Sequence, residues 1–209
     1  MTDSEGLHLI SIGKDDEAKA DIVFIHGLGG GSHSTWRNRD KKKGIDFFWP
    51  QEFASDFPKC KVWTIGYPAG ITSLGQPGMI MEKRAGNLSL KLRNSGLGNR
   101  PLFLVAHSMG GLIIKTLIVN SQILAGADRK CVANAVKGIV FCATPHRGTD
   151  FANAAGVFGK FLGGSQDHVK ELESGKEALN ILHDQFIEWH RHNPIKIQSY
   201  AENIGLFRD

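Results

Sequence analysis

A serine between a strand-like and a helix-like segment has the surroundings in this chain that best fit a chemical role. Ser108 follows the apolar run Leu102–Ala106 and precedes two glycines and the apolar segment 112–125. This order of strand, sharp turn and helix is typical of a nucleophile elbow, in which small neighbours expose the hydroxyl. Such a serine reacts only if a base can reach it and backbone N–H groups can receive the oxyanion. The alternative, a serine that caps a helix after a core strand, stays open.

A glycine-rich turn after another strand-like run is expected to provide the first of these N–H groups. The sequence HGLGGG begins at His26 and follows the strand-like segment 21–25, which reads DIVFI. One oxyanion donor is expected near Gly27–Leu28, and the N–H of Met109 is expected to be the second. The glycine spacing matches neither of the common phosphate-binding patterns, but a purely structural turn stays open. Four residues are therefore expected to bind the substrate: His26, Gly27, Leu28 and Met109.

The acid of the expected triad is Glu202. This residue follows the alternating segment Ile195–Tyr200, whose period of two predicts a strand. In one known type of triad the chain order is serine, then acid, then histidine, and Glu202 fits this order after Ser108. The alternative is a solvated glutamate at the end of a strand, which is the more common situation for this residue type.

The histidine of such a triad is harder to assign. Three histidines lie in or beside an amphipathic helix and are interpreted as surface residues, namely His183, His190 and His192. Three others flank the expected site but precede the acid in the chain, namely His26, His107 and His146. A catalytic role of His146 in place of a later histidine stays a further hypothesis. No ligand spacing indicates a metal site, and we expect no cofactor.

The segments that must position these residues alternate between strand-like and helix-like patterns. Short strands are expected at 7–12, 21–25, 61–65, 102–106, 138–142 and 195–200, and helices at 49–57, at 81–92 and after Gly111. This alternation predicts an α/β fold with a mainly parallel, doubly wound sheet and helices on both faces. In such sheets the sites form at the carboxyl ends of the strands, where Ser108, the turn after Ile25 and Glu202 all fall.

Length and composition indicate a single domain. The chain has 209 residues, of which 41% are apolar and 22% charged, as in an ordinary soluble globular protein. We expect one domain over residues 1–209, with a flap-like or cap-like insertion at 149–192 whose apolar, glycine-rich part is 151–164. No apolar run approaches the roughly 20 residues that cross a bilayer. The acidic start lacks a secretion signal, and three cysteines without a framework spacing favour a reducing, cytoplasmic location.

The charge pattern bears on the expected partners. The formal net charge is +4, and one cationic cluster contains Arg37, Arg39 and Lys41–Lys43. We interpret this cluster as a solvated loop rather than as an anionic-lipid or nucleic-acid patch. Aromatic residues do not interleave with the cations as they do in single-strand binders, so no nucleic-acid partner is expected. The expected partners are a small-molecule or lipid ester and, through peripheral contact, a membrane surface.

Several segments together resemble the α/β-hydrolase superfamily, and within it the lipase-like serine-active-site-containing proteins and GPI inositol-deacylase-like lipases. The segments extend from about Ile22 to Ala152 and read VFIHGLGGGSHSTWR, FWPQEF, VWTIGYPAG, RPLFLVAHSMGGLIIKTLI and GIVFCATPHRGTDFA. The resemblance implies that Ser108 is the nucleophile and that the HGLG loop supports the oxyanion. It also implies a catalytic carboxylate at the position of Glu202.

The same resemblance implies a further strand and a loop with the catalytic histidine beyond Asp209. Two hypotheses follow. In the first, the chain is the N-terminal part of a larger multidomain protein and acts as a serine hydrolase on a carboxylic, lipid-like ester. In the second, the strand and the histidine loop are absent, so the triad does not work, and the chain is a catalytically silent hydrolase-fold module with an interaction or sensing role in a larger protein. Binding without turnover, and full biological activity of a Ser108→Ala protein, are expected only of the second.

Overall fold

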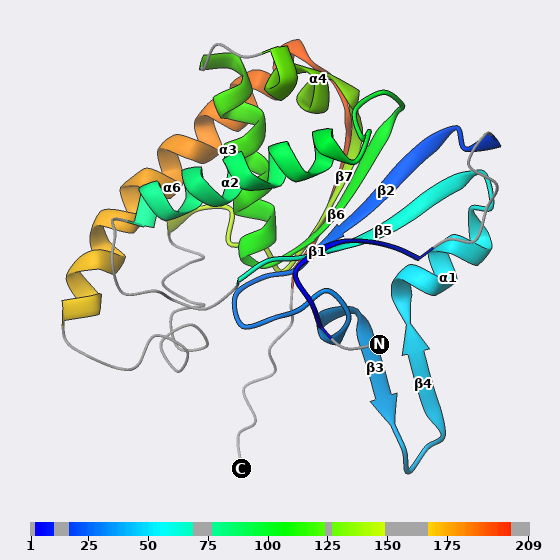
Figure 1. Ribbon diagram of the computed structural model, residues 1–209. Helices are drawn as coiled ribbons and strands as arrows, with labels where there is room; N and C mark the ends of the chain where they lie inside the picture. Colours follow the sequence, from blue (N-terminus) through cyan, green and yellow to red (C-terminus); the bar gives the residue numbers. More distant parts are fainter. Residues whose placement is uncertain (1–2, 11–16, 69–76, 124–126, 149–166, 202–209) are drawn as a thin grey trace.

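A six-stranded sheet forms the centre of the molecule (Figure 1). The computed structural model describes residues 3–10, 17–68, 77–123, 127–148 and 167–201. In spatial order the strands are β1 (Gly6–Leu9), β5 (Cys60–Gly66), β2 (Ala20–Ile25), β6 (Leu102–His107), β7 (Val136–Cys142) and β8 (Lys196–Tyr200). Strand β1 is antiparallel to β5, and all the other neighbouring pairs are parallel. The prediction of a mainly parallel, doubly wound sheet is therefore confirmed.

Helices cover both faces of this sheet. Figure 1 shows α1 (Trp49–Asp56) on one side of the strands. The opposite side carries α2 (Pro77–Asn94), α3 (Met109–Ile123), α4 (Ala127–Ala135) and α6 (Asp167–His192). The core is accordingly split into two clusters, a large aliphatic one under the four helices and a smaller one around Phe24 and Trp36. Central parallel strands are apolar on both faces for this reason.

The apolar patterns of the sequence account for the helix packing. Leu112, Ile113 and Ile114 follow one another in α3 and therefore point in different directions, yet all three are buried, the last two in the large cluster together with Leu117. In α2 the apolar residues Ala85, Leu88 and Leu92 recur at spacings of three and four, which places them on one face, and all three are buried in the same cluster. Helix α3 is therefore held on several sides. Its first turn is fixed relative to the sheet.

The basic segment was predicted to be a loop, and this prediction is wrong. Residues Arg37–Asp40 form β3 and residues Ile45–Phe48 form β4, which pair antiparallel as a separate two-stranded hairpin. The segment is exposed, as expected, but it projects away from the body of the molecule as an ordered element (Figure 1). The cross-strand pairing of Arg39 with Asp46 gives the physical reason, because charged partners replace the apolar alternation on which a strand prediction depends.

The segment 149–192, expected to be a flap-like or cap-like insertion, divides into two parts. Residues 149–166, including the glycine-rich stretch 151–164, lie outside the described residues. The remainder belongs to α6, which connects β7 to β8 and packs against α3. Phe186 and Trp189 of α6 are buried in the large core cluster. Helix α6 therefore belongs to the same layer as α2, α3 and α4, which covers one face of the sheet.

Candidate active site

Ser108 occupies a sharp turn between β6 and α3. Its backbone is left-handed, with φ of 52°, which costs a residue with a Cβ about 1–2 kcal/mol. Two hydrogen bonds fix the turn: the Ser108 N–H donates to the Cys142 carbonyl (2.8 Å), and the Gly111 N–H donates to the Ser108 carbonyl (3.1 Å). The residue is partly exposed, and its Oγ makes no hydrogen bond within the described part of the chain. The backbone hydrogen bonds therefore fix the position of the residue, while its hydroxyl group has no hydrogen-bond partner among the described residues.

Close backbone contacts explain the glycines around this serine. A Cβ atom at Gly27 would lie 2.7 Å from the Cβ of Ser108 and 3.0 Å from the carbonyl oxygen of His107. A Cβ atom at Gly110 would lie 2.5 Å from the carbonyl oxygen of Ile25. Larger residues at either position would push the β2 and β6 loops apart. The two loops are therefore in van der Waals contact because glycine occupies both positions.

The glycine-rich segment after β2 is a tight turn. The Gly30 N–H donates to the Gly27 carbonyl (3.3 Å), and Gly29, the third residue of the turn, has φ of 65°. A positive φ at this position is the signature of a type II turn and favours glycine. Leu28 is half-buried against the large core cluster. Within the described residues, neither the Leu28 N–H nor the Met109 N–H donates a hydrogen bond.

His26 supports this turn from the inside. Its ring is buried and stacks on Tyr67, with ring centroids 4.1 Å apart and an interplanar angle of 10°. Nδ1 lies 2.9 Å from the Gly27 carbonyl oxygen, and Nε2 lies 3.4 Å from the Tyr67 N–H nitrogen. A neutral ring protonated on Nδ1 satisfies both contacts, and burial lowers the pKa of His26 accordingly. His26 was predicted to bind the substrate, but both of its ring nitrogens have partners within the protein.

Sequence reasoning missed two residues beside the turn. Tyr67 donates its hydroxyl to the His26 carbonyl, and burial raises the pKa of this phenol. Arg84 of α2 donates from Nη1 to the sulfur of Met109 (3.2 Å), and burial lowers the pKa of its guanidinium. Tyr67 follows the carboxyl end of β5, so its place in the sheet was the available signal. Arg84 lies inside α2 and not at the end of a strand, so the sequence contained no signal that placed it near the site.

His146 lies toward the β8 side of the sheet. Its Nε2 is 3.3 Å from the Ser199 Oγ, and its ring meets the Phe141 ring edge-on with centroids 4.9 Å apart. The His183 ring lies 5.9 Å away, with its Nδ1 2.9 Å from the Nζ of the buried Lys115. No hydrogen bond joins His146 to Ser108 among the described residues. Glu202, the expected acid, lies outside the described residues.

Within the described ranges, no three His, Cys, Asp or Glu side chains gather closely enough to hold a metal ion. Cys60, Cys131 and Cys142 are free cysteines. No helix in the described part of the chain is both long and apolar enough to cross a membrane.

Solved structures with a similar fold include a bacterial lipase. The mature form of the Bacillus licheniformis lipase BlEst2 matches with a TM-score of 0.59 and 22% sequence identity, over 92% of this chain and 70% of the lipase. The chain has the α/β-hydrolase fold. In this hydrolase fold the described turn at Ser108 and the turn at Gly27 lie together at the carboxyl edge of the sheet.

Sequence comparison agrees with the resemblance seen in the motifs. The chain is 29% identical to human protein SERAC1 over 205 residues, and 30% identical to the zebrafish (Danio rerio) protein over 207 residues. Each match covers 90% of this chain and 31% of the relative, so the chain spans about a third of the length of these proteins. No protein-family model matches the chain.

Proposed function

We propose that this hydrolase-fold chain is a serine hydrolase that cleaves a carboxylic, lipid-like ester with Ser108 as the nucleophile. The observation that carries the proposal is the left-handed backbone of Ser108 at the turn between β6 and α3. A serine that merely caps a helix has no need of this conformation, because N-cap residues adopt extended backbone angles. A turn that must present a hydroxyl to a substrate does need it, and such strain is concentrated at active sites.

The proposed reaction begins with attack of the Ser108 Oγ on the ester carbonyl carbon. The hydroxyl proton passes to a histidine beyond Asp209, outside this sequence, and Glu202 holds that histidine in the required tautomer. The carbonyl oxygen takes up negative charge and accepts hydrogen bonds from the Leu28 and Met109 N–H groups. The intermediate then collapses, and the departing alcohol takes the proton from the histidine. Water hydrolyses the acyl-enzyme by the same sequence of steps.

Two observations support this assignment of the oxyanion donors. The Leu28 and Met109 N–H groups donate no hydrogen bond within the described residues, so both are available to a ligand. Met109 is also the first residue of α3, where the helix dipole favours negative charge. Loss of one such donor typically slows acyl transfer by about 10²–10³-fold.

The substrate class rests on the comparison with BlEst2, which is named as a lipase. We infer an ester with an apolar acyl chain, and residues 151–164 are proposed to cover that chain. The extent of the single domain 1–209 and the reducing, cytoplasmic location stay predictions, as does membership of a larger multidomain protein.

A second candidate function is that of a catalytically silent module that binds an ester-like ligand. The observation in its favour is that no described histidine forms a hydrogen bond with Ser108. Such a module would retain ligand binding but would neither turn over an ester nor react with an active-site probe.

Covalent labelling with a fluorophosphonate probe tests both candidates. We expect the probe to modify Ser108 of the full-length protein, which would contain the catalytic histidine, with the labelled peptide identified by mass spectrometry. The Ser108→Ala variant should lose the label, whereas Ser55→Ala, which changes an exposed serine of α1, should keep it. Absence of labelling in the folded, full-length protein would favour the silent module and contradict the serine hydrolase.

A further inference from the structure

The β3–β4 hairpin has an internal network of ion pairs that fixes its shape. Asp46 accepts hydrogen bonds from Arg37 Nε and Nη2 (both 2.6 Å) and from Arg39 Nη2 (3.0 Å). These bonds hold the pKa of the Asp46 carboxyl well below its usual range. At the tip, the carboxylate of Asp40 accepts hydrogen bonds from the backbone N–H groups of Lys42 (3.0 Å) and Lys43 (3.2 Å). Both acidic side chains of the hairpin are therefore engaged within it.

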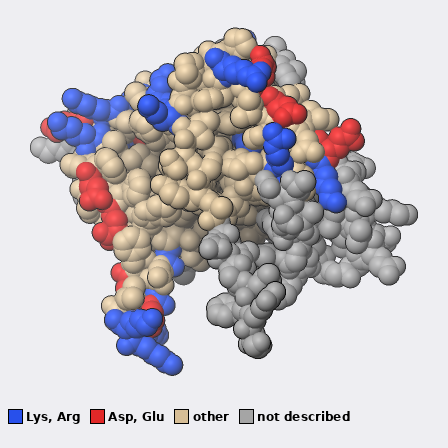
Figure 2. Space-filling view, turned by 180° about the vertical axis from the view of Figure 1, so that it is seen from behind, with Lys and Arg blue, Asp and Glu red and all other residues tan. Residues whose placement is uncertain are grey.

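This network leaves positive charge at the tip. Between Arg37 and Asp46 five cationic and two anionic side chains give a net charge of +3, against +4 for the whole chain. Lys41, Lys42 and Lys43 are all exposed, and Figure 2 shows blue side chains gathered at the end of the hairpin. Lys43 has only a loose contact with the carboxylate of Asp40, at 3.8 Å.

An apolar face adjoins these lysines. Ile45 and Phe47 are 40% and 43% exposed, so the hairpin presents two large apolar side chains to solvent. The two residues are separated by one position on β4, so they lie on the same face of the hairpin. They stand in register with Asp40 and Asn38, on the face opposite to the Arg37–Asp46 ion pair. Lysines beside exposed aromatic and aliphatic side chains are the composition of membrane-interface elements.

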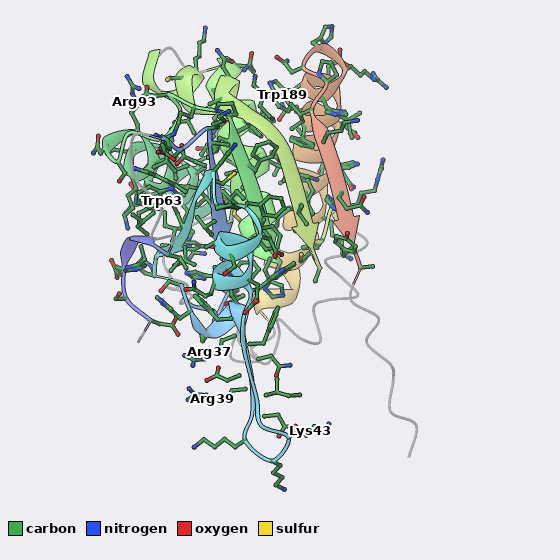
Figure 3. All side chains as sticks on the ribbon, turned by 90° about the vertical axis from the view of Figure 1, so that its right-hand side faces the viewer. Arg37, Arg39, Lys43, Trp63, Arg93 and Trp189 are labelled. Carbon is green, nitrogen blue, oxygen red and sulfur yellow. The ribbon has the colours of Figure 1, made fainter. Side chains whose placement is uncertain are left out.

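The base of the hairpin is anchored to the body. Trp36, directly before β3, is buried in the smaller core cluster. Phe48, the last residue of β4, stacks on His33 with ring centroids 5.2 Å apart and an interplanar angle of 10°. The tip therefore projects in a fixed direction. Figure 3 shows this direction: the hairpin, with Lys43 at its end, extends past the edge of the sheet toward which the parallel strands point.

We propose that the β3–β4 hairpin docks this protein onto an anionic lipid bilayer. The tip lysines bind the headgroups, and Ile45 and Phe47 enter the interfacial layer between headgroups and acyl chains. A flat, negatively charged surface fits a projecting tip. A single nucleic-acid strand instead requires a charged groove with several stacking residues. Docking in this orientation turns the carboxyl edge of the sheet, with Ser108, toward the bilayer, and this last consequence rests on the proposed function.

Vesicle binding tests the docking without any catalysis. The full chain with Ser108→Ala is sedimented with phosphatidylcholine vesicles and with vesicles of phosphatidylcholine and phosphatidylserine. We expect binding to the anionic vesicles only, weakening as salt is added. The combined change Lys41→Gln, Lys42→Gln and Lys43→Gln should weaken binding on the order of 100-fold. The pair Ile45→Ser and Phe47→Ser should also weaken it, while circular dichroism shows an intact fold in both variants.

A matched triple variant removes the same charge elsewhere. Lys59, Lys130 and Lys137 are exposed and lie off the hairpin, and their replacement by glutamine should leave vesicle binding within about twofold. Equal loss of binding in this control, or equal binding of the unchanged chain to neutral vesicles, overturns the proposal. Loss of binding to a single-stranded oligonucleotide in the hairpin variant, with vesicle binding intact, would also overturn it. Probe labelling of Ser108 is independent of all these outcomes.

Discussion

Gly27 lies directly against Ser108: a Cβ atom at Gly27 would be only 3.2 Å from the Ser108 hydroxyl oxygen. The contact joins two loops that leave neighbouring parallel strands, β2 and β6. It sets the separation between the glycine-rich turn and the serine. The proposed oxyanion site depends on that separation more than on any side chain.

The first prediction concerns the Gly27→Ala variant. The added methyl group meets the Ser108 Cβ and the His107 carbonyl, so the two loops must separate. We expect the rate of fluorophosphonate labelling to fall at least tenfold and the free energy of unfolding to fall by about 1–3 kcal/mol. Gly86→Ala is the matched control. That position, inside α2, has open space, and the change should stabilise the chain by about 0.5–1 kcal/mol. Unchanged labelling of Gly27→Ala would show that the contact is not needed.

The second prediction concerns the strain at Ser108. Replacement by glycine removes both the hydroxyl and the cost of a positive φ, whereas replacement by alanine removes only the hydroxyl. We expect Ser108→Gly to unfold at a temperature about 2–4 °C above that of Ser108→Ala, measured by calorimetry. Among the described residues Ala143 is the second non-glycine residue with positive φ (50°), and Ala143→Gly should show a gain of similar size. Equal melting temperatures of the two Ser108 variants would mean that the turn relaxes without cost.

The third prediction concerns a buried carboxylate. Asp21 is fully buried and accepts hydrogen bonds from Arg100 Nε (3.1 Å) and Nη2 (2.9 Å) and from Trp63 Nε1 (3.0 Å). Arg100→Gln leaves the carboxylate without its cation, so we expect a loss of about 3 kcal/mol in the free energy of unfolding in urea. Arg191→Gln removes an exposed partner of Glu188 and should cost less than about 1 kcal/mol. Similar losses in the two variants would be evidence against a structural role of the Asp21 pair.

The fourth prediction concerns acid stability. Burial lowers the pKa of His26 below its ordinary value of about 6.5, so the folded chain binds fewer protons than the unfolded chain just below that pH. The contribution of neutral, buried His26 to the free energy of unfolding is therefore complete above about pH 6.5. It is lost as the pH falls toward the lowered pKa of this residue. His33, whose pKa is also lowered by burial, adds to the same effect.

Urea unfolding at pH 7.5 and pH 5.5 measures this dependence. The His26→Gln variant should be less stable than the unchanged chain at pH 7.5, yet should lose less stability on acidification. His192→Gln makes the same replacement at an exposed position of α6 and is the control for the loss of stability at pH 7.5. An unchanged pH dependence in His26→Gln would show that another group titrates.

The sequence predicted the sheet and the turns that follow β2 and β6 well, for a physical reason. Residues 22–25 are all buried, and within 102–106 Phe103 alone is exposed, so burial on both faces makes these two segments almost continuously apolar. The start of α3 was placed after Gly111, whereas the helix begins at Met109. Glycine lowers helix propensity, but the close packing of Gly110 against Ile25 outweighs that preference.

The parts that could not be predicted depend on contacts across long stretches of chain. The β3–β4 hairpin has no apolar alternation in Arg37–Asp40, and its order comes from ion pairs to the second strand. The stacking of Tyr67 on His26 joins residues 41 positions apart, and neither residue carries a local pattern that indicates it.

The shared direction of the hairpin and the parallel strands has a kinetic consequence. A protein anchored by that hairpin would encounter its ester by diffusion within the plane of the bilayer. Its turnover would then follow the mole fraction of substrate in the surface, and dilution of that substrate with inert lipid would slow the reaction even when the bulk amount stayed constant.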